Sequence, residues 1–369
     1  MTTGAVSEIG QSQVNDLRVL QDPTDPTVAS AGVRDVGNDV LRGIAIFSVL
    51  FIHTTASWDR LPLNGWQLQA YGFVRLLCGL WLPLFLIVSG YYAGRTDIRS
   101  LQDFRVFLKK RLARIFIPYC IWSVVNFLPK YANGQMTLSD LLPGIAFGRL
   151  CYPYYFIPVL VKLYLAYPMF CFCVQRRRLI FPAMVVLAFL WLYPASLDDY
   201  AGLRTSRMTE WIFRRSVHVD WAFLFFLGIT LRRLNVIPRM RDVINPGQMS
   251  RVLGALLFVC LAATVMSICV SSWFVVLLAV ALFILLNIAD QTVLAKRFKA
   301  VAFLGTMSYT IYLLHEPALG YLCRALEGVL RSHPFLTLLP LLAFSIGFPI
   351  AVHWAFSMLI GKRARLVVG

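Results

Sequence analysis

An arginine and a histidine interrupt the apolar stretch at residues 41–55, which reads LRGIAIFSVLFIHTT. Arg42 and His53 are 11 positions apart, and at about 100° per residue this separation is three turns plus about 20°. The two side chains therefore share one helix face, about 16 Å apart along its axis. Ionisable side chains inside a membrane cost free energy and often mark a site. Alternatively, the arginine reaches lipid head groups and the histidine bonds a neighbouring helix.

A second histidine lies in a similar setting, in the stretch FLGTMSYTIYLLHEP. Ser308, Tyr312 and His315 are spaced by four and three residues, which places them on one face of a helix. His315 is expected at a depth in the membrane close to that of His53. A histidine can take a proton from a hydroxyl, whereas the tyrosines can equally serve helix packing.

Two further arginines and a serine follow in the next apolar stretches. Arg111 and Arg114 open the segment that contains RLARIFIPY, and Ser89 lies in LFLIVSGYY. With Arg42, the two arginines are expected to converge on the cytoplasmic leaflet. Planar guanidinium groups match phosphate oxygens, so the cluster suits a phosphate-rich ligand. The alternative is the ordinary positive charge of cytoplasmic loops.

The elements that carry these residues are predicted to be membrane-spanning helices. Of the 369 residues, 59% are hydrophobic and 14% charged, where a soluble domain has about 25% charged residues, and the mean hydropathy is +0.69. Several uncharged windows are long enough to cross a hydrocarbon core of about 30 Å, and they do not alternate as barrel strands would. We therefore predict an all-α, polytopic transmembrane bundle.

Ten spans are expected, and the loops after the even-numbered spans are basic. This alternation places both termini in the cytoplasm. The outer loop at 198–216 holds four arginines, so either these residues are functional or the fifth and sixth spans are misplaced. The predicted spans are 40–57, 73–93, 112–129, 153–174, 179–197, 217–234, 252–270, 272–289, 301–322 and 335–359.

The remaining segments and charges fit the same membrane topology. Residues 1–36 are predicted to be a disordered cytoplasmic tail, residues 37–360 the transmembrane domain, and residues 361–369 a basic cytoplasmic tail. The net charge of +17 follows from basic loops, so no nucleic-acid partner is expected. The eight cysteines show no CxxC pair, and neither a disulfide framework nor a metal site is expected.

Six of these motifs, in this order, resemble acyltransferase family 3, the integral-membrane O-acyltransferases of bacterial surface sugars. The resemblance covers most of residues 38–360. It implies transfer of an acyl group, most often acetyl from cytoplasmic acetyl-CoA, to a hydroxyl of a glycan, with His53 as the catalytic histidine and Arg42 as its motif partner. The six motifs are NDVLRGIAIFSVLFIH, LFLIVSGYY, RLARIFIPY, YYFIPVLVKLYLAYP, FLFFLGITL and LGTMSYTIYLLHEP.

The resemblance implies roles for the other residues as well. Arg111, Arg114 and Arg42, with Ser89 nearby, would bind acyl-CoA as the donor substrate, and no permanently bound cofactor is expected. His53 would act as the base or would itself be acylated first. His315 would orient the acceptor or relay a proton. Tyr312, Ser308 and Arg42 are unranked candidates for stabilising the oxyanion.

The acceptor is expected to be a sugar of an exopolysaccharide, lipopolysaccharide or lipo-oligosaccharide, free or lipid-linked, at the bacterial inner membrane. Tyr154 and Trp211 in the outer loops would stack on sugar rings, or else anchor the chain at the interface. Besides membrane lipids, polysaccharide-assembly proteins are potential partners. The competing hypotheses are a transporter or flippase of a lipid-linked sugar, and a non-catalytic scaffold.

Overall fold

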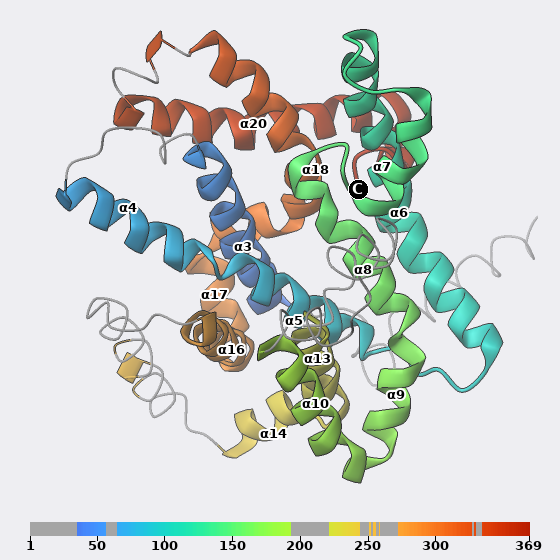
Figure 1. Cartoon of the computed structure of the whole chain (residues 1–369). Coiled ribbons are helices and arrows are strands. Elements are labelled where there is room, and N and C mark those ends of the chain that lie inside the picture. Colours follow the sequence, from blue (N-terminus) through green and yellow to red (C-terminus); the bar gives the residue numbers. More distant parts are fainter. Residues whose placement is uncertain are drawn as a thin grey trace, which may run out of the picture. The chain divides into compact units, whose positions relative to one another are not determined.

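The computed structural model describes residues 35–56, 65–192, 221–243, 251, 254–255, 258, 272–326, 328–329 and 334–369. Within these ranges every regular element is a helix (Figure 1), which confirms the all-α prediction. Residues 37–369 form one compact unit. The elements that matter for the site are α3 (Val36–Thr54), α5 (Trp81–Ala93), α6 (Leu101–Ala132), α8 (Phe156–Leu165), α13 (Ala222–Arg233), α16 (Ser272–Ile288), α18 (Lys299–Ala325) and α20 (Pro334–Ile360).

Three helices in the described ranges are long and apolar enough to cross a membrane. They are α3, α6 and the Phe335–Ile360 part of α20. Two bent pairs raise the number to five if each pair is one span, namely Leu138–Phe147 with Tyr152–Leu165 and Val276–Ile288 with Gln291–Arg297. Ten spans and the orientation of the termini stay predictions, and the expected span at 252–270 lies almost entirely outside the described residues.

Several helix boundaries differ from the expected ones. Helix α6 begins at Leu101, because the Ser100 hydroxyl accepts a hydrogen bond from the backbone N–H of Asp103 and the Asp103 carboxylate accepts one from that of Ser100. The expected span at 153–174 is divided into α8 and α9 (Tyr167–Gln175). Pro168 lies in the first turn of α9, and its missing N–H ends the preceding helix.

Helices α6 and α20 expose apolar side chains that a soluble protein would bury. Leu339 and Leu359 of α20 are 74% and 78% exposed, and Leu128 of α6 is 56% exposed. Large contiguous apolar surfaces are rare on soluble monomers, whereas helices that face lipid tails require them. These two helices therefore expose apolar surface of the kind that faces lipid.

Glycines allow two pairs of helices to cross at backbone contact. On α18, a Cβ at Gly305 would lie 1.7 Å from the backbone oxygen of Asp39 on α3. Where α5 crosses α13, a Cβ at Gly228 would lie 2.2 Å from the backbone oxygen of Ile87. Small residues at such crossings are typical of membrane helix packing. The α3–α18 crossing matters most, because these two helices carry both parts of the candidate site.

The segment at 361–369 packs against the bundle. It forms 3₁₀ turns at Gly361–Leu366, and the Trp122 indole of α6 donates to the Val367 carbonyl over 2.9 Å. Thr310 of α18 donates to the carbonyl of Val368 over 2.7 Å, and the Val368 side chain is fully buried. The segment predicted as a basic tail is thus held between α6 and α18.

Candidate functional site

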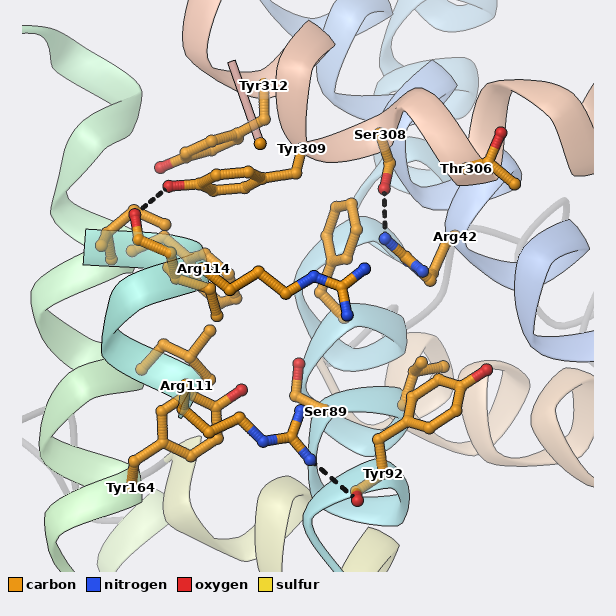
Figure 2. Close-up of a pocket in the computed structure, with 17 residues that line it drawn as sticks. Arg42, Ser89, Tyr92, Arg111, Arg114, Tyr164, Thr306, Ser308, Tyr309 and Tyr312 are labelled. Atoms are coloured by element: carbon orange, nitrogen blue, oxygen red, sulfur yellow. Dashed lines mark hydrogen bonds between the residues drawn. The ribbon is translucent and has the colours of Figure 1, made fainter. Parts of the chain in front are cut away.

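A cavity of about 330 Å³ opens among α3, α5, α6, α8 and α18. Its size is within the range of ligand pockets, about 300–1,000 Å³. The cavity brings together Arg42, Arg111 and Arg114, the three arginines that the sequence predicted would converge (Figure 2). The other lining residues used below are Ser89, Tyr92, Tyr164, Ser308, Tyr309 and Tyr312.

Two of the three guanidinium groups are oriented by the protein. Arg42 donates to the Ser308 hydroxyl over 3.2 Å, and its guanidinium lies 3.9 Å from the Asp39 carboxylate. Arg111 donates to the Tyr92 carbonyl over 2.9 Å and lies 5.6 Å from the centre of the Tyr164 ring. Both side chains retain further N–H groups for a ligand, because each guanidinium has five.

Arg114 extends across the cavity with no dashed contact to any residue drawn (Figure 2). No Asp or Glu side chain is among the lining residues of this cavity, which also include Gly369, the last residue of the chain. Three guanidinium groups line it, and the Asp39 carboxylate lies 3.9 Å from that of Arg42. The cavity therefore carries an excess of positive charge. Fork-shaped donors with unbalanced charge suit the oxygens of a phosphate or another anion.

An aromatic series on α18 leads from the cavity toward His315. The rings of Tyr309 and Tyr312 are stacked with centroids 6.4 Å apart, and the rings of Tyr312 and His315 are 6.2 Å apart. The Tyr309 hydroxyl donates to the Ile115 carbonyl, and that of Tyr312 donates to the Pro153 carbonyl. Since Tyr312 lines the cavity, one ring separates the cavity from His315.

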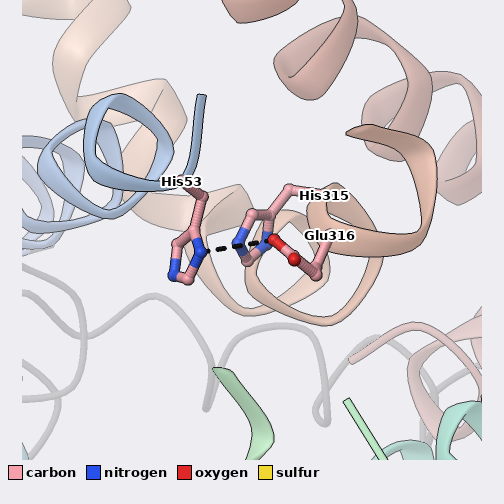
Figure 3. Close-up of side chains that lie close together, drawn as sticks. All are labelled: His53, His315 and Glu316. Carbon is pink, nitrogen blue, oxygen red and sulfur yellow. Dashed lines mark ion pairs between the residues drawn. The ribbon is translucent and has the colours of Figure 1, made fainter. Parts of the chain in front are cut away.

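His53, His315 and Glu316 form a compact cluster at the far end of this series (Figure 3). The His53 and His315 ring centroids are 5.1 Å apart, as the predicted similar depth requires. Nδ1 of His53 lies 3.3 Å from Oε2 of Glu316, with the side chains 10% and 33% exposed. His315 is fully buried, and its Nδ1 lies 3.0 and 2.9 Å from the carbonyls of Ile311 and Tyr312.

The histidine cluster can perform base chemistry. With its proton on Nδ1, neutral His53 donates to the Glu316 carboxylate and presents the lone pair of Nε2. A carboxylate in this position fixes the tautomer of the imidazole and stabilises the imidazolium that forms when Nε2 takes a proton, as in the serine-protease triad. The carboxylate therefore orients His53 so that Nε2 can act as a base.

Comparison with known protein families decides the class of the chain. A family model described as an acyltransferase domain, that of acyltransferase family 3, matches residues 35–359. The chain belongs to acyltransferase family 3. No curated protein and no solved structure matches it. The family resemblance stated from the motifs is confirmed. As a member of family 3, the chain is a membrane acyltransferase that acylates hydroxyl groups.

The other predicted site residues of this acyltransferase lie in three different settings. Ser89, Ser308 and Tyr312 line the arginine cavity. Tyr154 is fully buried, and its hydroxyl donates to the Leu313 carbonyl over 2.7 Å, so it offers no outer surface to a sugar. The adjacent Tyr152 is 75% exposed and its ring lies 5.7 Å from that of His53. Trp211 lies outside the described residues.

Glu316 is a member of the histidine cluster that the sequence did not lead us to expect. It directly follows His315 in the motif LLHEP, and an acidic residue at the end of an apolar stretch is itself a signal of function. The helix face shared by Ser308, Tyr312 and His315 does not include Glu316. Neighbouring residues on a helix point about 100° apart, yet both lie beside His53: the His315 ring centroid is 5.1 Å from that of His53, and Oε2 of Glu316 is 3.3 Å from its Nδ1.

Proposed function

We propose that this acyltransferase moves an acyl group, most often acetyl, from cytoplasmic acyl-CoA to a hydroxyl of a bacterial surface glycan. The observation that carries the proposal is the arginine cavity, which the Tyr312 ring separates from His315 and so from the cluster that holds the His53–Glu316 pair. The donor phosphates and the base would then sit at opposite ends of one path. Such a path suits a donor with a phosphate-rich head and a long arm that ends in a thioester.

In this proposal the 3′-phospho-ADP part of acyl-CoA binds Arg111, Arg114 and Arg42. Arg114 supplies a guanidinium with no partner among the residues drawn, so binding a phosphate costs it no existing bond. Arg42 is held by Ser308, which positions it at the wall shared with α18. The pantetheine arm passes the stacked rings of Tyr309 and Tyr312 and presents the thioester near His53.

The chemical step is an acyl transfer assisted by a general base. Nε2 of His53 takes the proton of the acceptor hydroxyl while the hydroxyl oxygen forms a bond to the thioester carbonyl carbon. The carbon–sulfur bond then breaks, and the leaving thiolate takes the proton back from the imidazolium. Glu316 stabilises that imidazolium throughout. An acylated His53 is the alternative route, and transfer from it would need the same pair.

The acceptor and the topology complete the proposal. Ten spans with both termini in the cytoplasm would place the arginine cavity at the inner side of the bacterial inner membrane and the histidine cluster toward the outer side. An exopolysaccharide, lipopolysaccharide or lipo-oligosaccharide sugar, free or lipid-linked, would approach His53 past the exposed ring of Tyr152. Aromatic faces beside a base suit a sugar ring with a reactive hydroxyl.

The test is the acyl content of the surface glycan, measured by proton NMR in cells that lack this gene and carry either wild type or His53→Ala. Wild type should restore an O-acyl signal, and His53→Ala should not, at equal membrane levels of the two proteins. Purified wild type should also cleave acetyl-CoA in the presence of acceptor. Equal O-acylation by both proteins contradicts the proposed base, and absence of thioester cleavage together with loss of the glycan itself favours a flippase.

A further inference from the structure

We propose that His53, His315 and Glu316 also form a binding site for a divalent transition-metal ion, zinc in particular, and that the bound ion blocks acyl transfer. The cysteine pattern led us to expect no metal site, and the three residues come from two stretches far apart in the chain. The fold places them in one cluster (Figure 3). Two imidazoles and one carboxylate form a ligand set that zinc enzymes use, with a fourth position left for water.

The spacing of the ligand atoms fits a tetrahedral ion. One ring nitrogen of each histidine and one oxygen of Glu316 lie within 4.8 Å of one another. With bonds of about 2.0–2.1 Å, the ligand atoms of a tetrahedral zinc ion are about 3.3–3.4 Å apart. The His53 Nδ1 to Glu316 Oε2 distance of 3.3 Å already has this value. The other distances must shorten by about 1.5 Å at most, which side-chain rotation can supply.

His315 supplies an independent reason to expect a ligand. Its Nε2 is fully buried and has no hydrogen-bond partner in the described part of the chain. Its Nδ1 lies close to two backbone carbonyls of α18, so the ring proton belongs on Nδ1 and the lone pair on Nε2. A histidine that donates to a carbonyl through one nitrogen and offers the other is the usual arrangement at a metal.

An ion can reach the cluster from its exposed side. A third of the Glu316 side chain is exposed, and the exposed Tyr152 ring borders His53. The carboxylate offsets part of the ion's charge. The ion therefore does not have to pass through the arginine cavity. An ion on His53 Nδ1 displaces the ring proton to Nε2, which then has no lone pair for the acceptor hydroxyl, and it also takes the Glu316 carboxylate. Occupancy and base chemistry therefore exclude each other.

The experiment measures zinc bound to the purified, chelator-treated full chain in detergent, by metal analysis after gel filtration and by titration with zinc chloride. We expect about one zinc per wild-type chain. Glu316→Gln, which keeps the shape and the hydrogen bond to His53, and His315→Ala should each bind at least about tenfold more weakly. His353→Ala is the matched control, since His353 is a partly buried histidine outside the cluster whose Nδ1 lies 3.4 Å from the Thr310 hydroxyl.

Three results would overturn the site: no stoichiometric zinc in wild type, equal affinity in Glu316→Gln and wild type, or loss of zinc in His353→Ala alone. The metal readout does not depend on acyl transfer, so it also stands if the proposed function fails. Conversely, transfer measured in chelator tests the base alone. Inhibition by zinc should be reversed by chelator in wild type, and inhibition that persists after metal removal contradicts the blocking role.

Discussion

The arginine cavity and the histidine cluster share helices α3 and α18 but are built in different ways. The cavity draws its lining from five helices and gathers three guanidinium groups, so several contacts share one anionic ligand. The cluster consists of three side chains from two helices, and one lone pair of His53 performs the proposed step. A substitution in the cavity should therefore weaken donor binding only in part. A substitution in the cluster should abolish the acyl-transfer step.

The sharpest contrast should come from His53→Ala. Removing the base should lower kcat by about 10²–10⁴-fold, the usual contribution of general acid–base catalysis, while the KM for acyl-CoA stays within about twofold. Steady-state kinetics of the purified protein measure both constants. A raised KM with unchanged kcat would place His53 in donor binding and remove the distinction between the two regions.

Glu316→Gln should give the next largest loss. The amide still accepts a hydrogen bond from His53 Nδ1, but it lacks the charge that stabilises the imidazolium, so kcat should fall about 10–100-fold, at about 1.4 kcal/mol per tenfold. The KM for acyl-CoA should not move. If kcat is unchanged, the 3.3 Å contact positions the ring without supplying charge.

Arg114→Ala should affect the other kinetic constant. Loss of a charged hydrogen bond, about 1.5–3 kcal/mol, should raise the KM for acyl-CoA about 10–100-fold and leave the KM for acyl-pantetheine, which has no nucleotide, unchanged. Lys110→Ala is the control, because Lys110 is an exposed base on the same helix that does not line the cavity. Equal effects on both donors would show that Arg114 does not bind the nucleotide phosphates.

Gly305→Ala should impair both regions together, because its Cβ would force α18 away from α3. Overpacking of this kind costs about 1–3 kcal/mol, so the thermal midpoint in detergent should fall and both kcat and KM should worsen. Gly320→Ala on the same helix is the control, since a Cβ there meets nothing within 4 Å. A normal midpoint for Gly305→Ala would mean that the crossing relaxes without cost.

The smallest effect is expected at Asp97, which belongs to neither region. Arg233 and Arg99 donate to its carboxylate over 2.9 and 2.8 Å and hold the pKa of Asp97 below its usual range. A lowered folded-state pKa stabilises the fold above the unfolded pKa of about 3.9 and loses this effect as the pH falls through the folded value.

Because the Asp97 side chain is 41% exposed, the contribution should be under about 1 kcal/mol. Unfolding of wild type and Asp97→Asn should therefore differ slightly at pH 7 and converge below about pH 4, with identical transfer rates. A difference that grows on acidification would contradict this sign.

The sequence predicted local helical patterns better than tertiary contacts between distant segments. The helical period predicted that Arg42 and His53 share one helix face, and in the structure both contact α18. Composition predicted the all-α class, and every described regular element is a helix. The division of 153–174 into two helices depends on Pro168, which was visible but outweighed by the apolar run. The Pro153 carbonyl that engages the Tyr312 hydroxyl, and the burial of Tyr154, depend on packing between segments, which no helical period encodes.

The crossing of α3 and α18 also determines how long after synthesis of α3 the site can form during translation. Arg42 and Ser308 are 266 residues apart in sequence, and at synthesis rates of about 5–20 residues per second the second partner follows the first by roughly 13–50 s. Throughout that interval His53 is already inserted but has neither its carboxylate nor its neighbouring imidazole. A ribosome-bound chain is therefore expected to be inert toward thioesters. Activity is expected only after the ninth predicted span packs against the first.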